Sequence, residues 1–249
     1  MRALVSQEFL KMRRMVILRA VLIALCLGPA VVIATLRAVT SDIDAVTDPG
    51  LLIVGVVVVL GGIGSAILAA GVFGQEYDLA TGRGLLLRGA PRCGLLAAKV
   101  VSILAVMTAA GLVSVAAGLA CAMAAGWSAS LVQVGALFAK TATLVPLSSL
   151  VYLAAAGLGA VAGRSSAAGM LVGLMLFLIG FVLATLQTSY PLAGWFPETN
   201  LFSILGGDFA AALGIESATM ASAVSRLLVV GAGLLAAAAA LFDRQDLTG

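Results

Sequence analysis

The chain has 249 residues, of which 62% are hydrophobic and only 10% are charged. A soluble domain carries about 25% charged residues because its surface faces water, so this composition excludes a soluble globular protein and predicts that most of the surface contacts lipid. The formal net charge is +3. The basic residues are spread between apolar runs and form no patch or stripe, which argues against a nucleic-acid partner.

The chain begins with a short segment of amphipathic pattern, residues 1–14, followed by six long apolar runs. Val5, Phe9 and Met12 fall at helical spacing on one face of this segment, which predicts a helix on the inner leaflet of a membrane. A spanning helix needs about 20 apolar residues. Runs of this kind predict membrane spans at 15–36, 51–73, 100–125, 140–162, 166–187 and 224–242. The sequence therefore predicts an all-α integral membrane protein whose single transmembrane domain has six helices.

The charged residues between the apolar runs give these spans an orientation. With the N-terminus in the cytoplasm, 11 of the 14 Lys and Arg residues lie on the cytoplasmic side. This is the bias that sets the topology of membrane proteins. We therefore predict that both termini are cytoplasmic.

The longest outer segment is predicted at 188–222. It contains two apolar runs, 201–205 and 209–213, which are separated by two glycines and an aspartate and are too short to span. Such runs favour a re-entrant or interfacial helix pair before the last span. The alternative is a seventh span, which would place the C-terminus outside.

The chain lacks the residues that carry most catalytic and metal chemistry. It contains no histidine and no phosphate-binding loop, and its three cysteines have no metal-ligand spacing. The predicted spans are almost free of charge, with Arg19 and Lys140 near their ends. A transporter driven by a coupling ion usually needs ionisable groups within the membrane. We therefore predict no catalytic, cofactor or metal site in this chain, and expect that the energy for any uphill transport comes from another chain.

Residues 74–99 form a cytoplasmic loop between the second and third predicted spans. Its six charged residues are Glu76, Asp78, Arg83, Arg88, Arg92 and Lys99. The residues that share one helical face are Leu79, Arg83, Leu86 and Leu87. This pattern predicts a short amphipathic helix at the membrane surface, ended by Pro91. Leucines flanked by arginines suit a protein partner, although an inert interfacial helix that satisfies the charge bias explains the pattern equally well.

This loop resembles the first cytoplasmic loop of the membrane subunits of ABC-2-type ATP-binding-cassette exporters. The residues that match the pattern of that loop, in order, are Glu76, Thr81, Leu86, Leu87, Pro91, Arg92 and Lys99. In addition, Glu8, Lys11 and Arg14 resemble the segment that precedes the first span in that family.

The resemblance implies a coupling helix within residues 74–99 that docks on a separate nucleotide-binding ATPase subunit, which would hold ATP and Mg. The residues expected to couple the two subunits are Glu76, Leu79, Thr81, Arg83, Leu86, Leu87, Pro91, Arg92 and Lys99. It also implies a second permease subunit, in a homodimer or heterodimer, in the cell membrane of a bacterium or archaeon. The expected cargo is a hydrophobic or amphipathic compound: a drug, an antibiotic, a lipid or a lipid-linked compound.

Two other functions remain open at this point. The chain could be a membrane anchor or scaffold that recruits a soluble protein without transport. It could also be the substrate-binding membrane subunit of an importer, which would bind a small ligand without its partner.

Overall fold

The computed structural model describes residues 2–39, 48–78, 92–185, 194–206 and 219–244. The regular structure of this part of the chain is entirely helical, and six of its helices are long and apolar enough to cross a membrane. The predicted all-α architecture with six spans is therefore confirmed.

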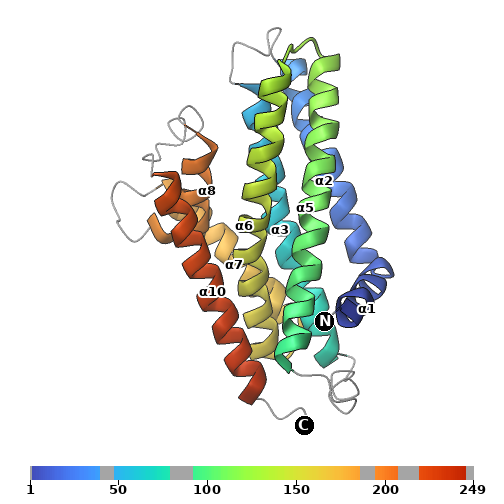
Figure 1. The fold of residues 1–249 in the computed structure, drawn as a ribbon, viewed down its shortest axis with the longest axis vertical. Helices are drawn as coiled ribbons and strands as arrows, with labels where there is room; N and C mark the ends of the chain where they lie inside the picture. Colours follow the sequence, from blue (N-terminus) through green and yellow to red (C-terminus); the bar gives the residue numbers. More distant parts are fainter. Residues whose placement is uncertain (1, 40–47, 79–91, 186–193, 207–218, 245–249) are drawn as a thin grey trace.

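The spanning helices form an elongated bundle (Figure 1). In chain order the described helices are α1 (Arg2–Arg13), α2 (Val16–Val39), α3 (Pro49–Asp78), α5 (Arg92–Ala124), α6 (Leu131–Gly163), α7 (Ser166–Thr185), α8 (Pro197–Leu205) and α10 (Met220–Arg244). Helix α1 lies at the same end of the bundle as the last residue of α10. We call this the terminal end and the opposite end the distal end.

Helices α3 and α6 form the centre of the bundle. In their most apolar stretches, 61% of the residues of α3 and 78% of those of α6 are buried, against 17–44% in the other four spanning helices. Both are apolar around their whole circumference, as is typical of buried helices. Helix α3 contacts α2, α5, α6, α7 and α8, so a movement at one of its ends reaches most of the molecule.

The fourth spanning helix begins earlier than the predicted span 140–162. Helix α6 runs without interruption from Leu131 because Ser130 and Gln133 form a capping box, in which each side chain bonds to the backbone of the other residue. The ends of the predicted loop 74–99 are also helical, since α3 continues to Asp78 and α5 begins at Arg92.

The segment predicted to be outside, 188–222, contributes α8, which is not one of the six spanning helices. It packs against α3, α6, α7 and α10. The second predicted outer run, 209–213, lies outside the described residues.

Candidate functional site

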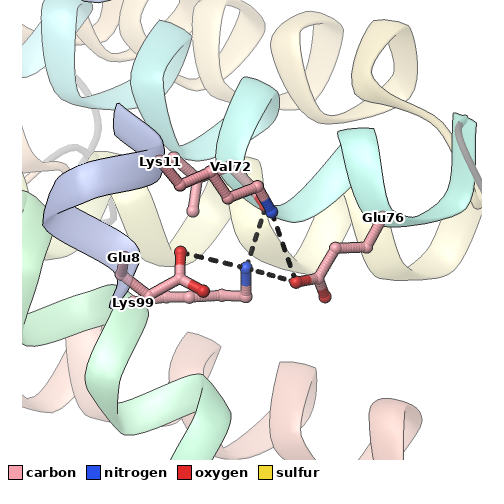
Figure 2. Close-up of polar contacts among 5 residues, drawn as sticks. All are labelled: Glu8, Lys11, Val72, Glu76 and Lys99. Carbon is pink, nitrogen blue, oxygen red and sulfur yellow. Dashed lines mark hydrogen bonds and ion pairs between the residues drawn. The ribbon is translucent and has the colours of Figure 1, made fainter. Parts of the chain in front are cut away.

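Four charged side chains from three helices meet near the terminal end of the bundle (Figure 2). We call them the ionic cluster: Glu8 and Lys11 of α1, Glu76 of α3 and Lys99 of α5. Glu8 and Lys11 are three residues apart, so they lie on the same face of α1. Glu76 is in the last turn of α3, and Lys99 is in the third turn of α5. The cluster therefore joins the N-terminal helix to the two helices that border residues 79–91.

The ammonium group of Lys99 lies at the centre of the cluster. The Nζ atom of Lys99 is 2.7 Å from Oε1 of Glu76 and 3.5 Å from Oε2 of Glu8. It also donates a hydrogen bond of 3.1 Å to the carbonyl oxygen of Val72, and it lies 5.7 Å from the centroid of the Phe73 ring. Only 2% of the Lys99 side chain is exposed. Its charge is therefore balanced by protein groups and not by water.

Lys11 supplies the second positive charge of the cluster. Its Nζ atom lies 3.5 Å from Oε1 of Glu76, and a third of its side chain is exposed. Two carboxylates and two ammonium groups thus balance one another. A buried charge is tolerated when it is paired, and removal of one partner typically costs about 3–5 kcal/mol because the other charge is left uncompensated. The arrangement therefore fixes the positions of α1, α3 and α5 relative to one another.

The last turn of α3 is also tied to α7. The Ser166 hydroxyl donates a hydrogen bond of 2.5 Å to Oδ2 of Asp78, and the Ser166 backbone N–H donates to the same oxygen at 3.4 Å. A carboxylate at the N-terminus of a helix caps unpaired N–H groups and opposes the helix dipole. Gly74 permits this approach, because a Cβ atom there would lie 2.2 Å from Cα of Ser166. Glu76 and Asp78 thus connect one turn of α3 to α1, α5 and α7.

A comparison with protein families bears on this arrangement. The family model described as ABC-2 family transporter protein matches residues 4–184. The match covers more than half of the chain and includes all four residues of the ionic cluster. The chain belongs to the ABC-2 transporter family. A comparison with curated protein sequences gave no match. The chain is thus a multi-pass transport permease, the transmembrane component of an ABC-2 transporter and not its ATPase.

Most of the residues predicted to couple this ABC-2 permease to an ATPase lie outside the described part of the chain. These are Leu79, Thr81, Arg83, Leu86, Leu87 and Pro91. Arg92 is the first residue of α5, and the structure does not describe its side chain. Glu76 and Lys99 are both described, and they contact one another.

The sequence analysis singled out Glu8 and Lys11 in the N-terminal segment and Glu76 and Lys99 in the loop 74–99, but it did not predict that these residues meet. Lys99 adjoins an apolar run, and Glu8 shares its segment with an apolar stripe. A charged residue beside so much apolar sequence signals a buried partner of opposite sign. The sequence thus indicated that these residues have buried partners of opposite charge, but it did not identify the partners.

A second polar site of the ABC-2 permease lies where α8 packs against α6. The Tyr152 hydroxyl of α6 donates a hydrogen bond to Oε1 of Glu198, in the first turn of α8. At the other end of α8, Nζ of Lys140 donates a bond of 3.2 Å to the carbonyl oxygen of Leu205. Because Lys140 is nearer the distal end than Tyr152, α8 runs along α6 with its first residues directed into the bundle. The sequence analysis did not predict this site.

Helix α10 holds the segment just before α8. The guanidinium of Arg226 donates a bond of 3.0 Å to the carbonyl oxygen of Gly194 and lies 5.7 Å from the Trp195 ring. The Asn200 side chain donates to the same carbonyl oxygen at 2.9 Å. The entry to α8 is thus fixed by polar contacts and one cation–π contact.

The carboxyl group of Glu198 is almost fully enclosed, with 2% of the residue exposed. Burial raises the pKa of Glu198 from 4.5 to about 7, although the hydrogen bond from Tyr152 acts in the opposite direction. A proton is therefore held far more tightly by this carboxyl than by one in water.

Proposed function

We propose that the chain is the membrane subunit of an exporter driven by ATP hydrolysis on a separate nucleotide-binding subunit, which docks on residues 79–91. The observation that carries the proposal is the ionic cluster at the base of that segment. A loop without a mechanical role has no need of buried charges at both of its ends. Here Glu76 precedes the segment, Lys99 follows it, and the two are paired at 2.7 Å.

The contacts around the segment give a route for coupling. A push on residues 79–91 acts on the last turn of α3 and on the start of α5. The ionic cluster passes this force to α1, and the contact between Asp78 and Ser166 passes it to α7. Closely packed helices move as rigid bodies between discrete arrangements. Closure of the ATPase subunits would therefore rearrange the bundle and open the pathway to the other side of the membrane.

The proposed cargo is a hydrophobic or amphipathic compound, and the proposed working unit contains two permease subunits and two ATPase subunits. Charged side chains are scarce within the predicted spans, which suits apolar cargo. Helix α7 exposes large apolar side chains along its length, among them Leu171, Leu178 and Val182. Such a surface suits lipid or a second permease subunit.

The test is co-purification of the permease, in nanodiscs, with its ATP-binding-cassette ATPase, whose gene we expect beside that of the permease. We expect the wild-type chain to form a stable complex and the double variant R83E/L86D to lose it. The first change reverses a charge in the docking segment, and the second replaces an apolar side chain with a charged one. We expect Lys99→Met to retain the complex but to lose most substrate-stimulated ATPase activity. The matched control is Arg13→Gln on α1, whose side chain is exposed.

A folded permease that never binds the ATPase would overturn the proposal and favour the scaffold function. A wild-type level of stimulated ATPase activity in Lys99→Met would show that the ionic cluster does not take part in coupling.

A further inference from the structure

The three buried carboxylates of the described residues differ in their partners. Glu8 and Glu76 each lie within 3.5 Å of the Lys99 ammonium group. Glu198 is as deeply buried, but among the described residues its polar side-chain partner is the neutral hydroxyl of Tyr152. The second carboxyl oxygen, Oε2, has no hydrogen-bond partner among the described groups. A buried ionised carboxylate without a counter-charge is strongly disfavoured, so Glu198 needs either a proton or a cation from beyond the described residues.

The helices around Glu198 do not supply that charge. Helix α7 has no charged residue, and the residues of α3 beside Glu198, Val58 and Val59, are apolar. Helix α6 contributes Tyr152 here, while its Lys140 bonds to the opposite end of α8. The nearby cation of α10, Arg226, is bonded to the carbonyl oxygen of Gly194 and stacked on a tryptophan.

Three aromatic rings, Tyr152, Phe177 and Phe202, line the cavity beside this carboxyl group. Tyr152 and Phe177 have ring centroids 6.1 Å apart, Phe177 and Phe181 are 6.3 Å apart, and Phe181 and Phe202 are 6.3 Å apart. Phe181 is 43% exposed on the surface of α7, so the series of rings leads from that surface to Glu198. Aromatic faces attract cations. A carboxylate behind a series of rings thus has the chemistry of a site for an organic cation.

We propose that Glu198 binds the positively charged group of the transported compound, which is therefore an amphipathic organic cation. This inference rests on the proposed transport function and adds the class of substrate to it. Glu198 lies beyond the residues that match the family, so the inference depends on the geometry of this chain.

The structure represents the closed state of this site. The cavity beside Glu198, Tyr152 and Phe177 has a volume of about 10 Å³, which is room for one water molecule at most. The Glu198 carboxyl lies directly against α7, where a Cβ atom on Gly180 would meet Oε2 at 1.8 Å. Because burial raises the pKa of Glu198 to about 7, the enclosed carboxyl group carries a proton below that pH. When α8 moves away from α7, the organic cation takes the place of that proton, which leaves to water.

The test uses the permease alone in nanodiscs, so that its outcome is independent of the ATPase. The probes are tetraphenylphosphonium and tetraphenylborate, which have nearly the same shape and opposite charge. Binding of each is measured by equilibrium dialysis between pH 5.5 and 8.5, with empty nanodiscs subtracted. Because the cation displaces a proton, we expect its affinity to rise by up to tenfold per pH unit below about pH 7 and to level off above it. Affinity for the anion should not change with pH.

Two variants make the test specific. Glu198→Gln keeps the size of the side chain but has no charge, and we expect it to lower cation affinity at least tenfold at pH 8 and to remove the pH dependence. Tyr152→Phe keeps the ring and removes the hydrogen bond that lowers the Glu198 pKa, so we expect the rise in affinity to move to higher pH.

Equal losses of cation and anion binding in Glu198→Gln would overturn the inference, because they would show that the Glu198 side chain acts through packing and not through its charge. A further variant, Ser203→Cys, reports on the accessibility of α8. The inference also fails if the accessibility of this cysteine changes with pH while tetraphenylphosphonium does not bind at any pH, because the site then takes only a proton. If the cation binds but no ATPase complex forms, the site stands and the proposed transport function fails.

Discussion

At the scale of single residues, Lys99 determines whether the ionic cluster is balanced. Replacing it with methionine keeps most of the side-chain volume but leaves Glu8 and Glu76 buried with only the partly exposed Lys11 beside them. We expect Lys99→Met to lower the free energy of unfolding by about 3–5 kcal/mol. The measurement is thermal unfolding in detergent, with a decrease in Tm on the order of 10 °C.

A double variant separates charge from packing at the same site. Adding Glu8→Gln to Lys99→Met removes the carboxylate whose ion pair was with Lys99, whereas Glu76 keeps Lys11 as a partner, so part of the lost stability should return. The matched control is Lys140→Met, which loses one hydrogen bond to a carbonyl oxygen and should cost about 1 kcal/mol. An equal loss of stability in the two lysine variants would contradict the role of the cluster.

Glu198 gives the stability of the chain a pH dependence. Its pKa in the folded state, about 7, lies above the ordinary value of 4.5, so the proton favours the folded state. This contribution is fully present below pH 4.5 and is lost as the pH rises to about 7. Glu198→Gln has no such loss. Between these pH values we expect the free energy of unfolding of the variant to rise by about 3 kcal/mol relative to that of the wild type. The measurement is the difference in Tm between the two proteins at each pH.

The sign of this change in relative stability shows whether the Glu198 carboxylate has a positive partner in the folded state. If the wild type instead gained stability relative to Glu198→Gln with rising pH, the carboxylate would have a positive partner in the folded state. Tyr152→Phe serves as the control for loss of the hydrogen bond without loss of the acid.

At the scale of helices, the close contact between α3 and α7 depends on Gly74. An added methyl group would meet the backbone of Ser166 at 2.2–2.3 Å, and a backbone cannot move aside as a flexible side chain does. We expect Gly74→Ala to push the helices apart and lower the free energy of unfolding by about 1–3 kcal/mol. The control is Gly135→Ala in α6, where nothing lies within 4 Å of the added Cβ. That change should stabilise the helix by up to about 1 kcal/mol. Equal effects of the two changes on Tm would contradict the close contact.

The helices that hydropathy alone determines could be predicted from the sequence. The six apolar runs predicted the six spanning helices because burial in lipid depends on composition and length. The predicted span 140–162 lies within α6, and the first turns of that helix, from Leu131, depend on the capping box of Ser130 and Gln133 and not on hydropathy. Helix α8 was expected only as one of a re-entrant or interfacial pair, since its packing depends on Tyr152 and Lys140, far away in the sequence.

The polar contacts were less predictable than the helices. The charges of Glu76 and Lys99 follow the orientation bias of membrane proteins, and that bias accounts for their presence without any contact between them. Glu198 was assigned to an outer loop on the same grounds. Its contact with Tyr152 is a product of the tertiary fold, in which a residue on a short helix reaches the interior of the bundle.

At the scale of the whole molecule, the ionic cluster lies on α1, α3 and α5, the Glu198 site lies on α3, α6, α7 and α8, and the two share no partner. Changes at independent sites add in stability to within about 0.3–0.5 kcal/mol. We therefore expect the effects of Lys99→Met and Glu198→Gln on the stability of the permease alone to be additive.

In the complete transporter the same two changes should not be additive. If ATP-driven movement enters at the ionic cluster and opens the site beneath α8, Lys99→Met already prevents that opening, and Glu198→Gln then has nothing further to remove. We expect the double variant to have the same cation-stimulated ATPase activity as Lys99→Met alone. The measurement is a double-mutant cycle on the stimulated rate, beside the same cycle on Tm. Additive losses in both cycles would mean that the ionic cluster and the Glu198 site act separately, and that the helices between them do not transmit the movement.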